Sequence, residues 1–119
     1  MGRSRNRDTN MIKMIYTGKK QPDATIEEFK AYYLEHHAPL FMKIVPQARK
    51  YTINFPTARP GKNPPPLDFD FITEIWWDDA DTVRAFYKSD DYKNIIQPDE
   101  LKLFASGSAV YFDEFVQKA

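Results

Sequence analysis

Hydrophobic and polar residues alternate along four segments of this chain, and this period of two predicts four β-strands. The segments are residues 10–19, 48–55, 69–77 and 108–116. All four contain aromatic and β-branched residues, whose side chains pack well on a pleated surface. Residues 56–68, between the second and third segments, contain five prolines, so we expect an irregular loop there that is either mobile or folds over a site.

A helical repeat follows the first strand, in residues 25–37 with the sequence TIEEFKAYYLEHH. Thr25 and Glu28 have the spacing of a capping box, which marks a helix start. Adjacent helical residues diverge by about 100°, so His36 is expected at the surface. Pro39 should break or kink the helix, and a short helical turn should follow it. The inward face is predicted to carry Ile26, Phe29, Tyr33 and His37.

A second helical region is predicted within residues 78–96, after an aspartate N-cap, with Val83 and Phe86 facing inward. Residues 98–108 are expected to form a connector before the last strand. The order strand, helix, strand, strand, helix, strand is typical of an α+β ferredoxin-like fold, βαββαβ. In this fold a four-stranded antiparallel sheet carries its helices on one face.

The other face of such a sheet has no helices to cover it. In the third strand, Asp70, Ile72, Glu74 and Trp76 share that face, and the alternation in the last strand adds Phe112. An apolar patch of this size would be unusual on a monomer, and a two-fold homodimer would bury it. Carboxylates enclosed between two such sheets would have raised pKa values.

The composition narrows the class of protein. Lys plus Arg balance Asp plus Glu at 17 each, which argues against a nucleic-acid or membrane partner. The chain has no cysteine, which excludes thiol chemistry and fits a cytoplasmic location. Aromatic residues make up 15% of the chain and suit a small-molecule pocket. We expect residues 1–10, with three arginines, to form a flexible tail, and residues 11–119 to form a single domain.

The segments 11–41, 48–55, 68–79 and 109–115 together resemble the EthD family. The most specific pieces are HAPL, which begins at His37, and DFITEIWWDD, whose Asp70 and Glu74 match acidic positions in that family. The resemblance implies ferredoxin-like domains that pair into a dimeric α/β barrel. Relatives of this architecture include a methylmuconolactone isomerase, polyketide cyclases, cofactor-free monooxygenases and haem-degrading enzymes. The resemblance places His37 and Tyr51 near the catalytic histidine and tyrosine of the isomerase.

These residues lead to a catalytic hypothesis. His37 would be the general acid or base of a cofactor-independent isomerase, cyclase or dehydratase, because imidazole exchanges protons near neutral pH. Tyr51 and Glu74 would hold the developing enolate or its proton. The cavity of the dimer's barrel would enclose a small apolar or aromatic carbonyl or phenolic compound. The residues expected to bind it are Asp70, Trp76, Tyr16, Phe112 and Tyr33.

Other readings of the same residues stay open. His37 is equally consistent with a structural role at the end of its helix. The protein could be a non-catalytic binding or accessory component of an oxidative, P450-type pathway, which the EthD resemblance also implies, or a metal-free monooxygenase. We expect no metal site, since adjacent histidines point apart on a helix and thiolates are absent. We also expect no cofactor, although one histidine would suffice as an axial haem ligand.

Overall fold

The computed structural model describes residues 11–63 and 65–119, so the predicted tail at residues 1–10 lies outside the described residues. The first half contains β1 (Ile12–Lys20), α1 (Ile26–Tyr32), the π-helix η2 (Tyr33–His37), α2 (Ala38–Ile44) and β2 (Ala48–Asn54). The second half contains β3 (Phe71–Trp77), α3 (Ala80–Tyr87), the π-helix η3 (Tyr92–Ile96), α4 (Gln97–Leu103) and β4 (Phe104–Phe112).

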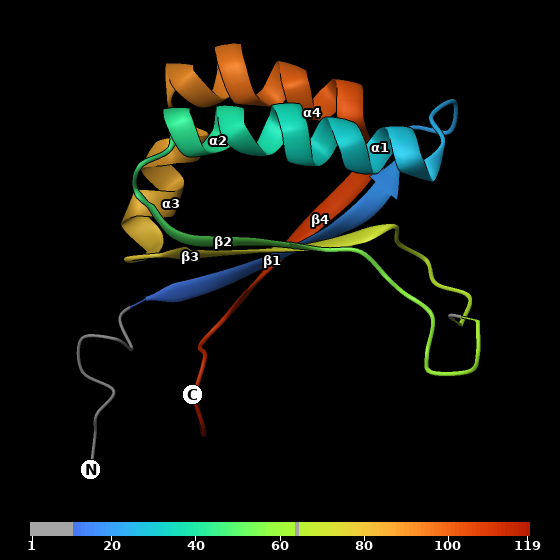
Figure 1. Ribbon diagram of the computed structural model, residues 1–119. Coiled ribbons are helices and arrows are strands. Elements are labelled where there is room, and N and C mark those ends of the chain that lie inside the picture. The colour runs from blue at the N-terminus through green and yellow to red at the C-terminus, as the bar shows by residue number, and fades with distance from the viewer. Residues whose placement is uncertain (1–10, 64) are drawn as a thin grey trace.

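The strands form one antiparallel sheet in the order β2-β3-β1-β4, which leaves β2 and β4 as its edges. The helices lie on one face of this sheet, and the chain runs away from the other face after β4 (Figure 1). This arrangement confirms the predicted α+β ferredoxin-like fold. It also means that one sheet face is uncovered within the protomer.

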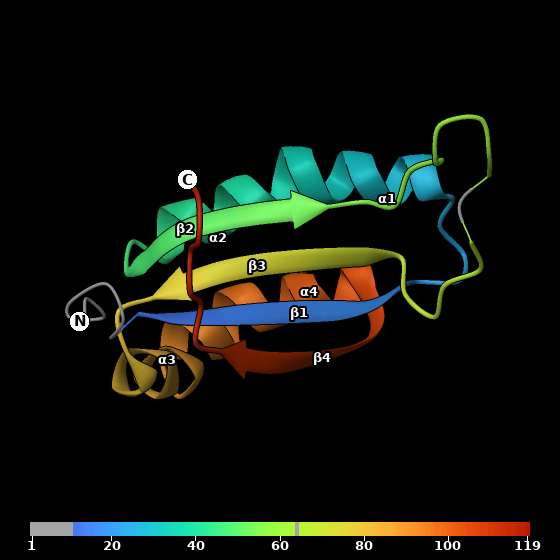
Figure 2. The same cartoon turned by 90° about the horizontal axis from the view of Figure 1, so that it is seen from below.

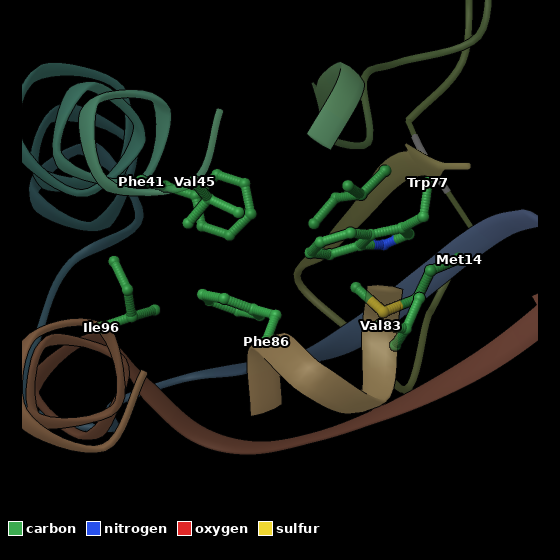
Figure 3. Packing of buried hydrophobic residues seen from close by; sticks show 8 residues of the cluster. Met14, Phe41, Val45, Trp77, Val83, Phe86 and Ile96 are labelled. Carbon is green, nitrogen blue, oxygen red and sulfur yellow. The ribbon is translucent and has the colours of Figure 1, made fainter. Parts of the chain in front are cut away.

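The alternation in β3 predicts its two faces correctly. Phe71, Thr73, Ile75 and Trp77 are at most 4% exposed beneath the helices. Two clusters build this core. One groups aliphatic and aromatic side chains of the sheet, α2, α3 and η3 around Trp77 and Phe86 (Figure 3). The other is mainly aromatic and comprises Phe29, Tyr33, Phe71, Leu103 and Phe104.

The first helix begins as predicted, because Thr25 and Glu28 form a complete capping box. The predicted break at Pro39, however, is wrong. The chain stays helical from α1 to α2 because η2 is a π-helix, in which the N–H of Ala38 bonds the carbonyl of Tyr33. A proline in a regular helix clashes with the carbonyl four residues earlier, and the wider turn just before Pro39 accommodates it.

The same construction recurs in the second half of the chain. Here the N–H of Gln97 bonds the carbonyl of Tyr92 in η3, and Pro98 opens the next helix. The predicted connector at residues 98–108 is therefore wrong, since Gln97–Leu103 form α4 and the last strand begins at Phe104. Pro98 fits the first turn of α4, because the N–H that proline lacks is not needed there.

The proline-rich segment between β2 and β3 is irregular, as predicted. Its described residues contain a single bridge, Arg59 with Lys62, and they project beyond the end of the sheet (Figure 2). Within the described chain, no helix is both long enough and apolar enough to cross a membrane.

Candidate functional site

The predicted site residues lie on two opposite faces of the sheet. Tyr16 and Tyr51 project from the sheet towards the helices, where they meet Tyr33 and His37 of η2. Glu74, Trp76 and Phe112 lie on the uncovered face, as shown by their shared register with Lys13 and Ile15 of β1. The expectation that Glu74 lies near His37 is therefore wrong. Strand alternation separates them, because Thr73 and Ile75 take the helix side and Glu74 does not.

A small cavity of ≈ 30 Å³ lies between the helices and the sheet. This volume holds one or two water molecules. Its apolar lining comes from Met14, Phe41, Ile75 and Phe104. Its polar lining consists of Tyr16, Tyr33, His37, Tyr51, Thr73, Tyr87 and Glu100. The imidazole, phenols and carboxyl around this space come from five different helices and strands, so the complete fold is needed to assemble them.

His37 is held by Asp99 of α4. Its Nδ1 lies 2.7 Å from Asp99 Oδ2, and the residue is only 3% exposed. Burial lowers the pKa of His37, and the bond to Asp99 opposes this effect. The imidazole is therefore neutral at neutral pH, with its proton on Nδ1 facing the carboxylate. This tautomer leaves the Nε2 lone pair available, and within the described residues only Nδ1 of this ring is hydrogen-bonded.

Asp99 is fixed in turn by Tyr32, whose hydroxyl donates to Oδ1 at 2.5 Å. Burial acts to raise the pKa of Asp99, but the bonds from Tyr32 and His37 outweigh it and lower the pKa. The hydrogen bond and burial also raise the pKa of Tyr32 to about 12, so its hydroxyl stays protonated. The arrangement Tyr32, Asp99, His37 resembles the way an aspartate orients the histidine of a catalytic triad.

Sequence reasoning missed Asp99, because residues 98–108 were predicted to be a connector. The available signal was the similarity of the two half-chains. Each has a tyrosine, a helical turn and then a proline, in YLEHHAP at residues 33–39 and in YKNIIQP at residues 92–98. Because a helical turn is predicted after Pro39 in the first half, the matching pattern indicates a helix after Pro98 in the second half. An acidic residue in that first turn, as Asp99 is, also suits the positive end of a helix.

The tyrosines of the cavity are donors. The hydroxyls of Tyr33 and Thr73 are hydrogen-bonded to each other. Burial raises the pKa of Tyr33, Tyr51 and Tyr87. All three therefore stay neutral at physiological pH, and their O–H groups can stabilise negative charge that develops on a ligand oxygen.

Phe41 and Tyr51 separate this cavity from a larger groove. Their ring centroids are 4.8 Å apart, and both residues line the small cavity as well as an open groove of ≈ 350 Å³ between α2 and β2. Small-molecule sites commonly have volumes of about 300–1,000 Å³. A compound that approaches His37 from this groove would have to displace these two rings.

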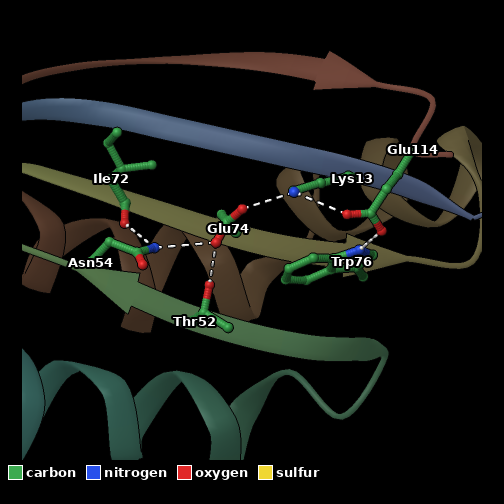
Figure 4. Close-up of polar contacts among 7 residues, drawn as sticks. All are labelled: Lys13, Thr52, Asn54, Ile72, Glu74, Trp76 and Glu114. Carbon is green, nitrogen blue, oxygen red and sulfur yellow. Dashed lines mark hydrogen bonds and ion pairs between the residues drawn. The ribbon is translucent and has the colours of Figure 1, made fainter. Parts of the chain in front are cut away.

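The carboxylates of the uncovered face are bound within a polar network (Figure 4). Lys13 Nζ lies 2.8 Å from Glu74 and 3.0 Å from Glu114. Thr52 and Asn54 also donate to Glu74. The bond to Lys13 lowers the pKa of Glu74, and partial burial only partly opposes it. In the protomer a lysine thus neutralises the charge of Glu74, and the rise in pKa expected between two sheets stays a prediction for the dimer.

Asp70 and Trp76 also have structural partners. Asp70 accepts a hydrogen bond from the backbone N–H of Lys20 at 2.8 Å, which fastens the end of β1 to the start of β3. Trp76 donates from Nε1 to Glu114 at 2.7 Å, and the ammonium groups of Lys13 and Lys50 lie over its ring. Trp76 is consequently 8% exposed, whereas Phe112 on the same face is 44% exposed. Among the described residues, no group of acidic and histidine side chains could hold a metal ion.

Residues 21–108 match the model of the EthD domain, which is most of the chain. The chain belongs to the EthD family. Two solved structures of proteins described as EthD family or EthD-like share the fold of this chain. An EthD family protein of Bacillus halodurans C-125 is 24% identical, with 88% of this chain and 99% of that chain covered and a TM-score of 0.68. An EthD-like protein of Ralstonia eutropha JMP134 is 18% identical, with 93% and 97% covered and a TM-score of 0.70. No curated protein sequence matches the chain.

More distant structures share the fold of this EthD protein. A dimeric ferredoxin-like protein of Thermobifida fusca YX is 17% identical, with 87% of this chain and 91% of that chain covered and a TM-score of 0.61. A hydroxynitrile lyase of Passiflora edulis is 9% identical, with 93% and 99% covered and a TM-score of 0.67. SnoaB, a cofactor-independent oxygenase of Streptomyces nogalater, is 13% identical, with 92% and 96% covered and a TM-score of 0.59. At these identities the similarity establishes the fold alone.

Proposed function

We propose that this EthD protein is a cofactor-independent acid–base enzyme acting on a small carbonyl or phenolic compound. The observation that carries the proposal is the buried pair of His37 and Asp99 beside a cavity lined by phenols. Asp99 holds the proton on Nδ1, so Nε2 is placed to accept a proton from a bound molecule. The hydroxyls of Tyr33 and Tyr51 would stabilise the enolate or phenolate that results.

The site in this proposal differs from the one expected from the sequence. The reaction would take place inside each protomer, between helices and sheet, and not in the cavity of the dimer's barrel. Glu74 and Asp70 have no part in it, because both are engaged on the sheet itself. The proposed catalytic residues are His37 and Tyr51, with Tyr16 and Tyr33 in contact with the ligand. The substrate would enter through the groove between α2 and β2.

A non-catalytic binding role is the second candidate, and the small volume of the cavity favours it. A protein that stores or delivers a small molecule in an oxidative pathway would need the groove and the phenols but no proton transfer. Two structural neighbours, the hydroxynitrile lyase and SnoaB, are enzymes, which supports the first candidate at the level of fold. The two candidates differ in whether replacing His37 should abolish proton transfer to and from a ligand.

The test compares His37→Gln with His36→Gln, because the neighbouring His36 side chain is 59% exposed. Small ketones with acidic C–H bonds would be incubated in D₂O, and deuterium uptake would be followed by NMR. The native protein should accelerate exchange, His36→Gln should match it, and His37→Gln should lose about 10²–10⁴-fold in rate. Ligand binding with no exchange in the native protein would instead favour the binding role. Equal exchange rates in the native protein and His37→Gln would refute His37 as the base.

We also propose that the chain forms a homodimer through the uncovered face of its sheet. Val110 and Phe112, which lie on that face, are 53% and 44% exposed in the protomer. A two-fold partner would bury them and close the α/β barrel.

A further inference from the structure

We propose that Glu100 is the proton donor that acts together with His37 in the same cavity. The site would thereby remove a proton from one atom of a small carbonyl compound and deliver one to another atom. This inference rests on the function proposed above. It adds a second catalytic group and selects one reaction class, isomerisation by proton transfer.

The position of Glu100 is unusual for a carboxylate. Among the described residues that line the cavity, it alone carries a carboxyl group. Glu100 forms no ion pair with any of the described residues, so no positively charged side chain among them neutralises its carboxylate. The hydroxyl of Tyr92 donates a hydrogen bond to Glu100 Oε1 at 2.7 Å. Glu100 is half-buried, and a carboxylate that loses much of its hydration without a cation beside it tends to keep its proton.

Electrostatics agree with this geometry. Burial raises the pKa of Glu100, the bond from Tyr92 opposes the effect, and the charge of Asp99 adds to it. Besides the carboxylate of Asp99, the groups that interact with its charge are five phenols: Tyr16, Tyr33, Tyr51, Tyr87 and Tyr92. None of them can neutralise an anion by carrying a positive charge.

Burial pushes the pKa of Glu100 up and that of His37 down, so the protonated carboxyl and the neutral imidazole are the favoured forms. A carboxyl that tends to keep its proton can act as the acid, and a neutral imidazole can act as the base. The two adjacent carboxylates of α4 thus have different tasks, since Asp99 orients the base and Glu100 supplies the proton.

The reaction balances without any further reactant. His37 Nε2 takes the proton from the carbon between the carbonyl and the double bond of a β,γ-unsaturated ketone. The electrons of that C–H bond shift to give a dienolate, held by the phenols. The terminal carbon of the dienolate then forms a new C–H bond with the proton of Glu100, which leaves a carboxylate and an imidazolium. Return of the proton from His37 to Glu100, through a tyrosine hydroxyl or the water that the cavity can hold, resets the site.

A proton acceptor and a proton donor beside one cavity suit isomerisation among the acid–base reactions. Such a reaction uses one substrate, and it releases no water or fragment.

A first experiment tests the protonation state of Glu100 without any ligand. Glu100→Gln would be compared with Glu27→Gln, an exposed glutamate of α1. The folded protein has the raised pKa, so above the ordinary value of 4.5 the unfolded chain releases its proton more readily and stability falls as the pH rises. Glu100→Gln should therefore have a higher Tm than the native protein at pH 7, and the gain should shrink towards pH 4.

The same samples would be examined by infrared spectroscopy. The native protein should show a protonated-carboxyl band above the pH at which ordinary glutamates ionise, and Glu100→Gln should lack it. Glu27→Gln should match the native protein in both measurements. A lower Tm for Glu100→Gln together with an unchanged infrared spectrum would overturn the proposal.

A second experiment separates the two proton transfers, with 3-cyclohexen-1-one as the probe and its conversion to the conjugated 2-cyclohexen-1-one followed by absorbance. His37→Gln should lose both isomerisation and deuterium exchange at the acidic carbon. Glu100→Gln should lose isomerisation by about 100-fold or more but keep the exchange. Native-like isomerisation in Glu100→Gln would reject Glu100 and leave His37 as the base. No isomerisation and no exchange in the native protein, or both retained in His37→Gln, would reject the proposed function itself.

Discussion

A buried histidine beside a buried aspartate is the residue-level feature on which the site depends. His37 loses hydration on burial, which favours its neutral form, while Asp99 keeps its charge because two donors satisfy it. A lone inward histidine would have been consistent with simple packing. The carboxylate at Nδ1 changes this, because it fixes which nitrogen is free to react.

The protonation of His37 should be visible in the pH dependence of stability. Its pKa is lower in the folded protein than the ordinary 6.5, so below that value the unfolded chain binds a proton that the folded protein resists. Stability should therefore decline as the pH falls from about 6.5 towards the lower folded pKa. Urea denaturation of His37→Gln should show a flatter profile over this window.

His36→Gln is the matched control for this titration. His36 Nε2 lies 3.6 Å from Asp99 Oδ1, but its side chain is 59% exposed, so its removal should leave most of the decline in place. Parallel profiles for His37→Gln and the native protein would show that the folded state does not disfavour the imidazolium.

At the scale of elements, the two π-helices place the site residues. Tyr33 begins η2 and bonds Thr73 of the sheet, and Tyr92 begins η3 and bonds Glu100. The wider π-turn lets the helix continue into a proline and rotates the residues before it relative to a regular helix. Such segments are frequent at functional sites. Here η2 lines the cavity with Tyr33 and His37, and η3 is linked to it through the bond from Tyr92 to Glu100.

The start of α1 gives a prediction about one helix. Thr25 accepts a hydrogen bond from the backbone N–H of Glu28 at 3.1 Å. Thr25→Ala removes this acceptor and should lower the free energy of unfolding by about 0.5–2 kcal/mol, measured by urea denaturation. Thr57→Ala, in the irregular loop, is the control and should change it far less. An equal effect of both substitutions would mean that the cap contributes nothing specific.

At the scale of the whole molecule, the uncovered sheet face is the largest unexplained surface. The polar network around Lys13 occupies the side of β3 and β2, while β4 presents Val110 and Phe112 to solvent. The chain beyond β4 continues away from this face with Phe115 and Val116 more than 60% exposed (Figure 1). Apolar groups gathered in this way are typical of an interface.

The proposed dimer can be tested with two variants, one that introduces a charged residue on the uncovered sheet face and one that introduces it on the helix side. Val110→Asp should convert the dimer to a monomer in sedimentation experiments at micromolar concentration, because a carboxylate would have to be buried without a partner. Leu101→Asp is the matched control, since Leu101 is 68% exposed on α4, away from the sheet face. It should leave the mass unchanged. A monomeric native protein, or a Val110→Asp variant that stays dimeric, would contradict the proposed interface.

The sequence by itself determined the first three strands, the start of the first helix with its capping box, the inward position of His37 and the two faces of β3. All of these follow from local periodicity, which side-chain direction imposes on any strand or helix. The last strand was predicted at residues 108–116, later in the chain than the observed Phe104–Phe112. The sequence could not determine which candidate residues meet. Asp99 reaches His37, and Glu100 reaches the cavity, only because α4 packs beside η2. Glu74 is separated from His37 because the sheet lies between them. Distances between residues far apart in the chain depend on how elements pack against one another, and only the tertiary structure decides that.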